Sequence, residues 1–435
     1  MPFIGTICYI CASFVRWSPP GLTTRRLVVI GYVWPEPNSS AAGENMLGLL
    51  TAFSGGGWDI TFLSAAADSA HMANLTECGI ATQRINVNCS KFDALIATLA
   101  PDVVIFDRFM TEEQFSWRVR QHCPGALRVL NTEDLHSLRH ARQQISKGKT
   151  EPPKNPTMPF NDDMVQREVA AIIRSDLTLV ISQSEYTLLT EQFAISPTQL
   201  LVQPLMIAPL AAVNTDESAR SGFTFIGNFR HAPNWDALLY LKETLWPKIR
   251  AALPHASLFV YGAYPGKKVT NLHNAKNGFL IEGWAPDARI ALSRHRVMLA
   301  PLRFGAGVKG KLVTAMQCQL PSITTAIGAE GIASDDAWPG AVTDNEDEFV
   351  SQSVFYYENA AARQQAVEKG NIIIARQFDT KTHQYALTAT ISNLLERLEA
   401  HRASLFYQQL LWHQNLRATQ YMSQWIEAKN AKNNS

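Results

Sequence analysis

The chain has 435 residues, of which 46% are hydrophobic and 18% are charged. A single hydrophobic core rarely grows beyond about 250 to 300 residues, so this length predicts two ordinary domains. Lys and Arg total 39 against 38 for Asp and Glu, so the bulk charge is nearly neutral. A nucleic-acid partner, which would need a strongly basic surface, is therefore disfavoured.

The six cysteines have neither the paired spacing of a disulfide framework nor that of a zinc site. We interpret them as reduced thiols of a cytoplasmic protein. Cys8 and Cys11 form one C-x-x-C pair, but the pair precedes the first predicted strand, where a redox motif is not expected.

The N-terminal residues and the hydropathy of the chain bear on its location. No stretch approaches the roughly 20 apolar residues that a membrane-spanning helix needs. The apolar run at 3–15 has no basic segment before it and is a poor signal peptide. We expect 1–26 to be a poorly defined leader and the protein to be cytoplasmic, with at most a peripheral contact at the inner face of the membrane.

Residues 27–204 alternate short β-branched runs with amphipathic helices. After a strand at 27–30 and a turn-rich segment at 35–40, a helix is expected to bury Met46, Leu47, Leu50 and Phe53. Thr111 to Gln114 has the composition of a capping box and predicts a helix start there. Such alternation predicts a doubly wound parallel sheet, with further strands at 60–63, 103–106, 127–130 and 177–181.

The same pattern restarts after a linker predicted at 205–221. The second domain, 222–375, is expected to carry strands and then helices, and 376–435 to form a helical tail. The predicted strands of the second domain are 223–226, 258–261, 279–281, 297–300 and 322–325. Because ligands bind at the carboxyl ends of strands in open α/β sheets, two such domains facing each other predict a ligand cleft between them.

The most informative segment is the glycine-rich loop between a predicted strand and a helix at 300–312. Gly305, Gly307 and Gly310 match G-x-G-x-x-G, and Glu330 follows at the distance of a dinucleotide fingerprint. The position of the loop weakens this match. A dinucleotide fingerprint follows the first strand of its domain, whereas this loop follows several strands of the second domain.

The same loop also approaches a P-loop, but Leu312 stands where a hydroxyl must hold magnesium. A third interpretation uses the cations around the turn, Arg303, Lys309 and Lys311, which would stabilise charge on a departing diphosphate. A basic turn that merely ends a strand at the surface is the alternative.

Three blocks in this half, 225–237, 300–311 and 325–331, resemble the donor half of group 1 (family 4 type) glycosyltransferases with the GT-B fold. In the first half, 134–139 and the stretch from Glu168 to Glu185 are similar to the acceptor domain of the same family. The resemblance implies two Rossmann-like domains facing across a cleft. It also implies retaining transfer from a nucleotide-diphosphate sugar to a glycan or lipid-linked acceptor, without a metal or another cofactor.

The resemblance also implies roles for individual residues. The implied catalytic residues are His136, facing the transferred sugar, and Arg230, Lys309 and Lys311, near the diphosphate. Asp134, just before His136, is instead expected to cap the following helix. The implied donor-binding residues are Gly43, Gly227, Arg303, Gly305, Gly307, Thr314 and Glu330.

The chain departs from the family pattern at Thr314, where many members carry a glutamate that binds the nucleotide ribose. A threonine cannot make the bidentate contact of a carboxylate, so donor affinity or base preference is affected. Two alternatives to an active transferase follow: a catalytically silent subunit that binds nucleotide sugars, and an NAD-dependent oxidoreductase. The sugar, the base, the acceptor and the oligomeric state are not predicted.

Overall fold

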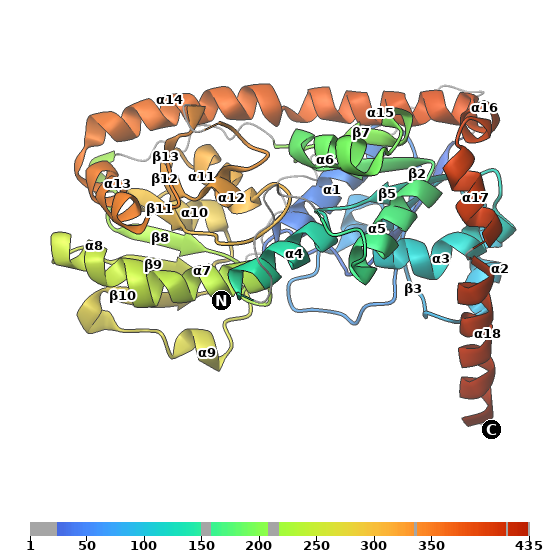
Figure 1. Cartoon of the computed structure of the whole chain (residues 1–435), viewed down its shortest axis with the longest axis horizontal. Helices are drawn as coiled ribbons and strands as arrows, with labels where there is room; N and C mark the ends of the chain where they lie inside the picture. Colours follow the sequence, from blue (N-terminus) through green and yellow to red (C-terminus); the bar gives the residue numbers. More distant parts are fainter. Residues whose placement is uncertain (1–23, 149–157, 208–216, 335–336, 415, 434–435) are drawn as a thin grey trace.

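The computed structural model describes residues 24–148, 158–207, 217–334, 337–414 and 416–433 (Figure 1). The expected leader therefore lies almost wholly outside the described residues, as does the middle of the expected linker. Within the described residues the chain forms two parallel sheets, ordered β3-β2-β1-β4-β5-β6-β7 and β10-β9-β8-β11-β12-β13. This confirms the predicted fold class of two doubly wound α/β domains with a helical C-terminal region.

The first sheet has helices on both faces because successive side chains of its interior strands are apolar. Leu27 and Val29 of β1 belong to one core cluster, and Val28 and Ile30 to the other. The helix predicted after the turn-rich segment is α1, and the four apolar residues expected on its inner face are buried. The strands are β1 (Arg26–Gly31), β2 (Asp59–Ser64), β3 (Ala81–Arg84), β4 (Val103–Asp107), β5 (Leu127–Asn131), β6 (Leu177–Val180) and β7 (Leu200–Val202). The helices are α1 (Ala41–Ser54), η1 (Leu75–Cys78), α2 (Lys91–Leu99), α3 (Phe109–His122), α4 (His136–Ser146), α5 (Asp163–Arg174), α6 (Gln183–Phe193) and η2 (Pro197–Gln199).

Two predicted helix starts in this domain are wrong. Helix α3 begins before the expected capping box, and the Thr111 hydroxyl donates back to the Asp107 carbonyl. Asp134 does not cap α4. Instead the Glu168 carboxylate accepts from the backbone N–H groups of His136 and Ser137, each at 2.9 Å. A carboxylate from the neighbouring helix α5 thus takes the capping role, which no local spacing could indicate.

The second domain carries the predicted strands and one short strand more, β13. The stripe expected after Pro233, from Ala237 to Ile249, is buried, although a π-turn interrupts the helix. The strands are β8 (Phe223–Ile226), β9 (Leu258–Tyr261), β10 (Phe279–Gly283), β11 (Val297–Ala300), β12 (Ser322–Thr324) and β13 (Gly340–Val342). The helices are η3 (Glu217–Ala219), α7 (Ala232–Tyr240), η4 (Leu241–Leu245), α8 (Trp246–Ala252), α9 (Lys267–Thr270), η5 (Ala275–Asn277), α10 (Ala288–Leu292), α11 (Gly310–Gln317), α12 (Ala326–Ala329), α13 (Glu346–Glu358) and α14 (Ala360–Gln377).

The C-terminal helices return to the first domain. Figure 1 shows α14 and α15 (Thr380–Glu396) lying end to end along both domains, and Leu387 and Ile391 of α15 join the first-domain core. Beyond them, α16 (Leu398–Ala403), α17 (Phe406–Gln414) and α18 (Leu416–Asn433) follow the outer side of the first domain. Trp412 is buried, whereas Trp425 on α18 is exposed.

One buried carboxylate anchors this tail. Asp176, just before β6, accepts hydrogen bonds from Arg128, Arg402 and Gln408. Burial alone would raise the pKa of Asp176, but the two guanidinium groups hold it well below its usual range. The ionised form therefore ties α16 and α17 to the first sheet.

Searched over the described residues, the structure contains no helix of the length and apolarity needed to cross a membrane. In the same part of the chain no three His, Cys, Asp or Glu side chains are grouped so as to hold a metal ion. Cys89, Cys123 and Cys318 are free thiols. Cys8 and Cys11 lie outside the described residues.

Candidate active site

The glycine-rich loop between β11 and α11 lies directly against the first domain. At Gly307, whose φ is 65°, an added Cβ would lie 2.8 Å from the Cβ of Asp134. At Gly310 an added Cβ would lie 2.4 Å from the Cβ of Ala41. Both glycines therefore permit close contact between the two domains, which adds to the phosphate approach expected from the sequence.

The two lysines of the loop point in different directions. The buried Lys309 ammonium donates to the Gly307 carbonyl at 2.7 Å and lies 3.7 Å from the Glu330 carboxylate. The Lys311 ammonium donates to the Asn234 side chain at 2.5 Å and lies over the Phe225 ring. Both lysines lie at the carboxyl end of the second sheet, Lys309 just before α11 and Lys311 in its first turn.

Lys311 is a cation without a counter-charge. Burial lowers the pKa of Lys311 to about 7, and no carboxylate of the described residues offsets this. Burial also lowers the pKa of Lys309, to about 8, against the opposing effect of Glu330. Enclosing a cation without a paired anion is unfavourable, so an arrangement of this kind is typical of a site that receives an anionic ligand.

Glu330 is part of a bridge between the domains. Both of its carboxylate oxygens accept hydrogen bonds from Arg142 of α4, each at 2.7 Å, and Arg142 also donates to the Gly305 carbonyl. Burial would raise the pKa of Glu330, but Arg142 and Lys309 together lower it. The carboxylate that the sequence assigned to the sugar or ribose is thus already ion-paired across the cleft.

A cavity of about 260 Å³ lies where α4 meets the start of α7. His136, Arg139 and His140 of α4 line one side, and His231 lines the other, from the second domain. His136 Nε2 lies 3.3 Å from Asp134, which also pairs with Arg139. Burial lowers the pKa of His136 to about 4, more than Asp134 raises it, so the imidazole is neutral at physiological pH.

A second interdomain contact joins the loop after β1 to the loop after β9. Tyr264, in the loop after β9, donates to Glu36 at 2.8 Å, and the guanidinium of Arg230 lies 3.5 Å from the centre of the Tyr264 ring. Gly43 lies under this contact, because an added Cβ would be 2.4 Å from the Glu36 backbone. Arg230 and Gly43 are therefore both at the interdomain contact.

The remaining predicted donor-binding residues make contacts within the second domain. Arg303 pairs with Asp236 of α7 at 2.6 Å, and its side chain is 44% exposed. Gly227 packs against Asn234, the partner of Lys311. The Thr314 hydroxyl donates to the Gly310 carbonyl within α11.

The sequence reasoning missed the contributions of Arg139, Arg142, His231 and Asn234. His231 and Asn234 lie within the 225–237 block, so that block contained a usable signal. The two arginines lie on α4, and nothing in their local spacing indicates that this helix faces the second domain.

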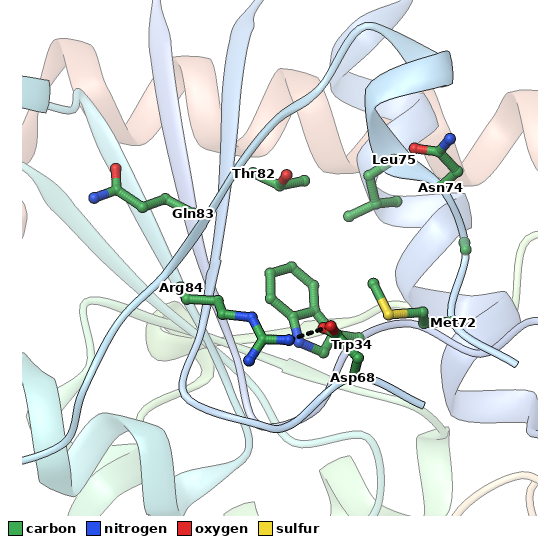
Figure 2. A pocket seen from close by; sticks show the side chains of 9 residues that line it. Trp34, Asp68, Met72, Asn74, Leu75, Thr82, Gln83 and Arg84 are labelled. Carbon is green, nitrogen blue, oxygen red and sulfur yellow. Dashed lines mark ion pairs between the residues drawn. The ribbon is translucent and has the colours of Figure 1, made fainter. Parts of the chain in front are cut away.

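Figure 2 shows another cavity, of about 290 Å³, at the carboxyl ends of β1 to β3. Trp34 and Met72 form its apolar part, and an exposed Asp68–Arg84 ion pair lies across it. None of the residues nominated from the sequence lines this cavity.

Residues 220–359 match the family model described as glycosyl transferases group 1. The second domain is thus similar to the group 1 glycosyltransferases. The matched segment contains β8 to β13 and both lysines of the glycine-rich loop. A comparison with curated proteins gives no match.

Solved structures with the GT-B architecture share the fold of this chain. Sucrose-phosphate synthase from Thermosynechococcus elongatus is 13% identical, with a TM-score of 0.64 over 86% of this chain and 99% of that one. HepE from Anabaena, solved in complex with UDP, is 14% identical, with a TM-score of 0.63 over 85% of this chain and 100% of that one. A point mutant of TarM from S. aureus, solved with UDP, fondaparinux and α-GlcNAc-glycerol, is 12% identical, with a TM-score of 0.56. That match covers 69% of this chain, and this chain spans 58% of the TarM chain.

The contact between the loop and α1 is open to a direct test. Gly310→Ala is expected to lower kcat tenfold or more, because the added methyl group cannot fit against Ala41 when the two domains are in contact. Misplacement of reacting groups by about 1 Å can lower the rate by up to about 10²-fold. Each domain should still fold, because Gly310 begins a helix and Ala favours a helix over Gly. Small-angle scattering should show a larger radius of gyration.

Gly125→Ala is the matched control, because an added Cβ there meets nothing within 4 Å. A Gly310→Ala protein with wild-type kcat and an unchanged scattering profile would contradict the contact.

Proposed function

We propose that the protein transfers a sugar, with retention and without a metal, from a nucleotide-diphosphate donor to a glycan or lipid-linked acceptor. The observation that carries the proposal is Lys311, a cation at the carboxyl end of the second sheet without a carboxylate partner among the described residues. A diphosphate bound between Lys311 and the first turn of α11 would supply the missing negative charge.

The chemistry needs few protein groups. The bond between the donor sugar C1 and the leaving phosphate oxygen breaks, and the acceptor oxygen bonds to C1 on the same face. The acceptor proton passes to the departing phosphate oxygen, so no protein base is required. The protein orients the two substrates and stabilises the diphosphate, and preorganised cations in an enclosed cleft are well suited to this.

The histidines of the interdomain cavity are placed for contact with the transferred sugar. His136 is neutral and is held by Asp134, so its imidazole can hydrogen-bond to sugar hydroxyls without adding charge. His231 approaches from the opposite domain. Closure of the domains would therefore complete the sugar site.

UDP is the expected nucleotide, because HepE and TarM are both described in complex with UDP. The test is thermal stabilisation of the protein by UDP, GDP, ADP, their sugars and NAD, since a ligand that binds only the native state raises the melting temperature. We expect a shift of several degrees with UDP and its sugars. A shift with NAD alone would overturn the proposal.

A catalytically silent subunit is the second candidate, because of Thr314. Its hydroxyl is engaged by its own helix, so α11 offers the ribose no carboxylate. Binding of UDP without either transfer or donor hydrolysis would favour this candidate. The oxidoreductase alternative is weakened, since Glu330, its expected ribose ligand, is ion-paired with Arg142.

A further inference from the structure

Arg142 of α4 reaches from the first domain to two loops of the second, and the mechanism above does not use it. Its guanidinium donates to the Gly305 carbonyl at 2.8 Å and to both carboxylate oxygens of Glu330, each at 2.7 Å. Gly305 lies in the loop after β11, and Glu330 lies at the end of α12, after the neighbouring strand β12. One side chain of the first domain therefore holds together the segments that follow two adjacent strands of the second sheet.

The ion pair between Arg142 and Glu330 has a defined geometry. Two N–H donors on two carboxylate oxygens fix the orientation of both groups, which a single hydrogen bond does not. The side chains of Arg142 and Glu330 are 16% and 27% exposed, so salt and water screen this pair less than a fully exposed one. The pair therefore sets where the Glu330 carboxylate lies when the domains are in contact.

Glu330 and the glycine-rich loop in turn surround Lys309. The Lys309 ammonium lies 3.7 Å from the Glu330 carboxylate and donates to the Gly307 carbonyl at 2.7 Å. An added Cβ at Gly305 would lie 3.4 Å from Lys309 Cε, so the loop folds around the lysine side chain. Arg142 thus contacts two of the residues that enclose Lys309, one of the two lysines expected near the diphosphate.

Arg142 belongs to a helix that is anchored in the first domain. The Glu168 carboxylate of α5 accepts from the backbone N–H groups of His136 and Ser137 at the start of α4. If the domains separated, Lys309 and its loop would stay with the second domain and would lose their contact with Arg142. The contact therefore exists only when the domains are closed on each other.

We propose that Arg142 is a positioning residue, which acts through Gly305 and Glu330 to hold Lys309 and the glycine-rich loop in the reactive arrangement when the domains close. The proposal rests on the proposed function and deepens it, because it names the first-domain residue that completes the diphosphate site. Glu330 is then the link between Arg142 and Lys309. Closure of domains or loops that completes a catalytic site is common among enzymes.

The location of Arg142 predicts which kinetic constant it affects. The nucleotide is expected to bind Lys311 and the first turn of α11, which belong to the second domain whether or not the domains close. Loss of Arg142 should therefore leave nucleotide binding nearly unchanged and should lower kcat, as for an interaction made only in the reactive state. An inhibitory latch predicts the opposite, because breaking it would raise kcat.

The test compares Arg142→Met and Arg142→Lys with the wild type. The reaction is hydrolysis of the nucleotide sugar selected by the thermal screen, followed as release of the nucleoside diphosphate, so that no acceptor has to be known. Arg289→Met is the matched control, because Arg289 of α10 pairs with Glu44 of α1 at 2.8 Å and so also joins the domains. The Arg289 guanidinium donates to Glu44 and is not part of the contacts around Lys309.

We expect Arg142→Met to lower kcat about 10²-fold, because displacement of a group at the reaction centre by about 1 Å has an effect of this size. The donor KM should change by about twofold or less, and thermal stabilisation by UDP should be retained. Arg142→Lys should lose about tenfold in kcat, since an ammonium can pair with Glu330 but cannot form the two parallel hydrogen bonds. Arg289→Met should have the wild-type kcat.

A double-mutant cycle with Glu330→Gln shows whether Arg142 acts through Glu330. Substitutions within one hydrogen-bond network have effects that do not add. In the Glu330→Gln background, Arg142→Met should therefore lower kcat by only about tenfold or less. A merely structural role would lower the melting temperature without ligand and would leave the kcat of the folded protein unchanged.

An unchanged or raised kcat in Arg142→Met, or an equal loss in Arg289→Met, would overturn the inference. An equal loss from Arg142→Met in both Glu330 backgrounds would also reject it. If Arg142→Met does not fold, the conservative Arg142→Lys decides, and a wild-type kcat in that variant rejects the positioning role. Failure of UDP to stabilise the wild type, or absence of donor hydrolysis by the wild type, would contradict the proposed function instead.

Discussion

Lys311→Met is expected to lower kcat/KM for the donor by about 10²-fold to 10³-fold, the usual loss when one preorganised group that stabilises transition-state charge is removed. The methionine keeps the length of the side chain and removes the enclosed charge, so the melting temperature without ligand should be unchanged or higher. The Lys309→Ala, Lys311→Ala double variant should abolish turnover while the far-UV circular dichroism stays native. Full activity in that variant would remove the phosphate site from the loop.

The lowered pKa of Lys311 implies that nucleotide binding depends on pH. With its pKa lowered to about 7, Lys311 loses its proton as the pH rises from 6 to 8, and the binding of UDP should weaken over this range. Lys309, with a pKa of about 8, extends the effect to higher pH. In Lys311→Met the lower part of this dependence should disappear, as isothermal titration calorimetry at several pH values can show. A wild-type affinity that is constant between pH 6 and 9 would contradict the assignment.

The largest expected effect on stability is at Asp176. Asp176→Ala leaves the buried guanidinium of Arg128 without its partner and frees Arg402 of α16. Removing one partner of a buried ion pair costs about 3–5 kcal/mol of the free energy of unfolding. Asp163→Ala on α5 is the control, because its contact with Arg167 is exposed and worth about 1 kcal/mol or less. Urea denaturation followed by circular dichroism measures both changes.

The contribution of Asp176 to the free energy of unfolding should decrease in acid. The pKa of Asp176 is lower in the folded protein than the value of 3.8 expected when unfolded, so the ionised carboxylate stabilises the fold above that pH. The difference between the wild type and Asp176→Ala should be constant above about pH 5 and should shrink as the pH falls further. A difference that grows in acid would show that the ion pairs do not provide the stabilisation.

The sequence by itself determined the elements that depend on local pattern. The apolar run at 27–30 indicated β1, because its successive side chains pack on the two faces of the sheet, and the stripe from Ala237 to Ile249 indicated its helix through its periodicity. The glycine-rich loop with Lys309 and Lys311 was predicted for the same reason: glycines, cations and the strand before them are contiguous. The loop appears where it was expected, after β11.

What only the tertiary structure decided is which charges are paired. Arg142 and Glu330 are 188 residues apart in the chain, so no spacing could show that Glu330 is ion-paired across the cleft. The sequence grouped Arg303 with the two lysines as cations around one turn, and the fold shows that its guanidinium pairs with Asp236 of α7. An ion pair forms only where the fold brings side chains from different helices or loops close together. The ion pairs that form determine which cations remain available to bind a ligand. Lys311 could be named from the sequence, but the absence of a carboxylate beside it among the described residues became visible only in the fold.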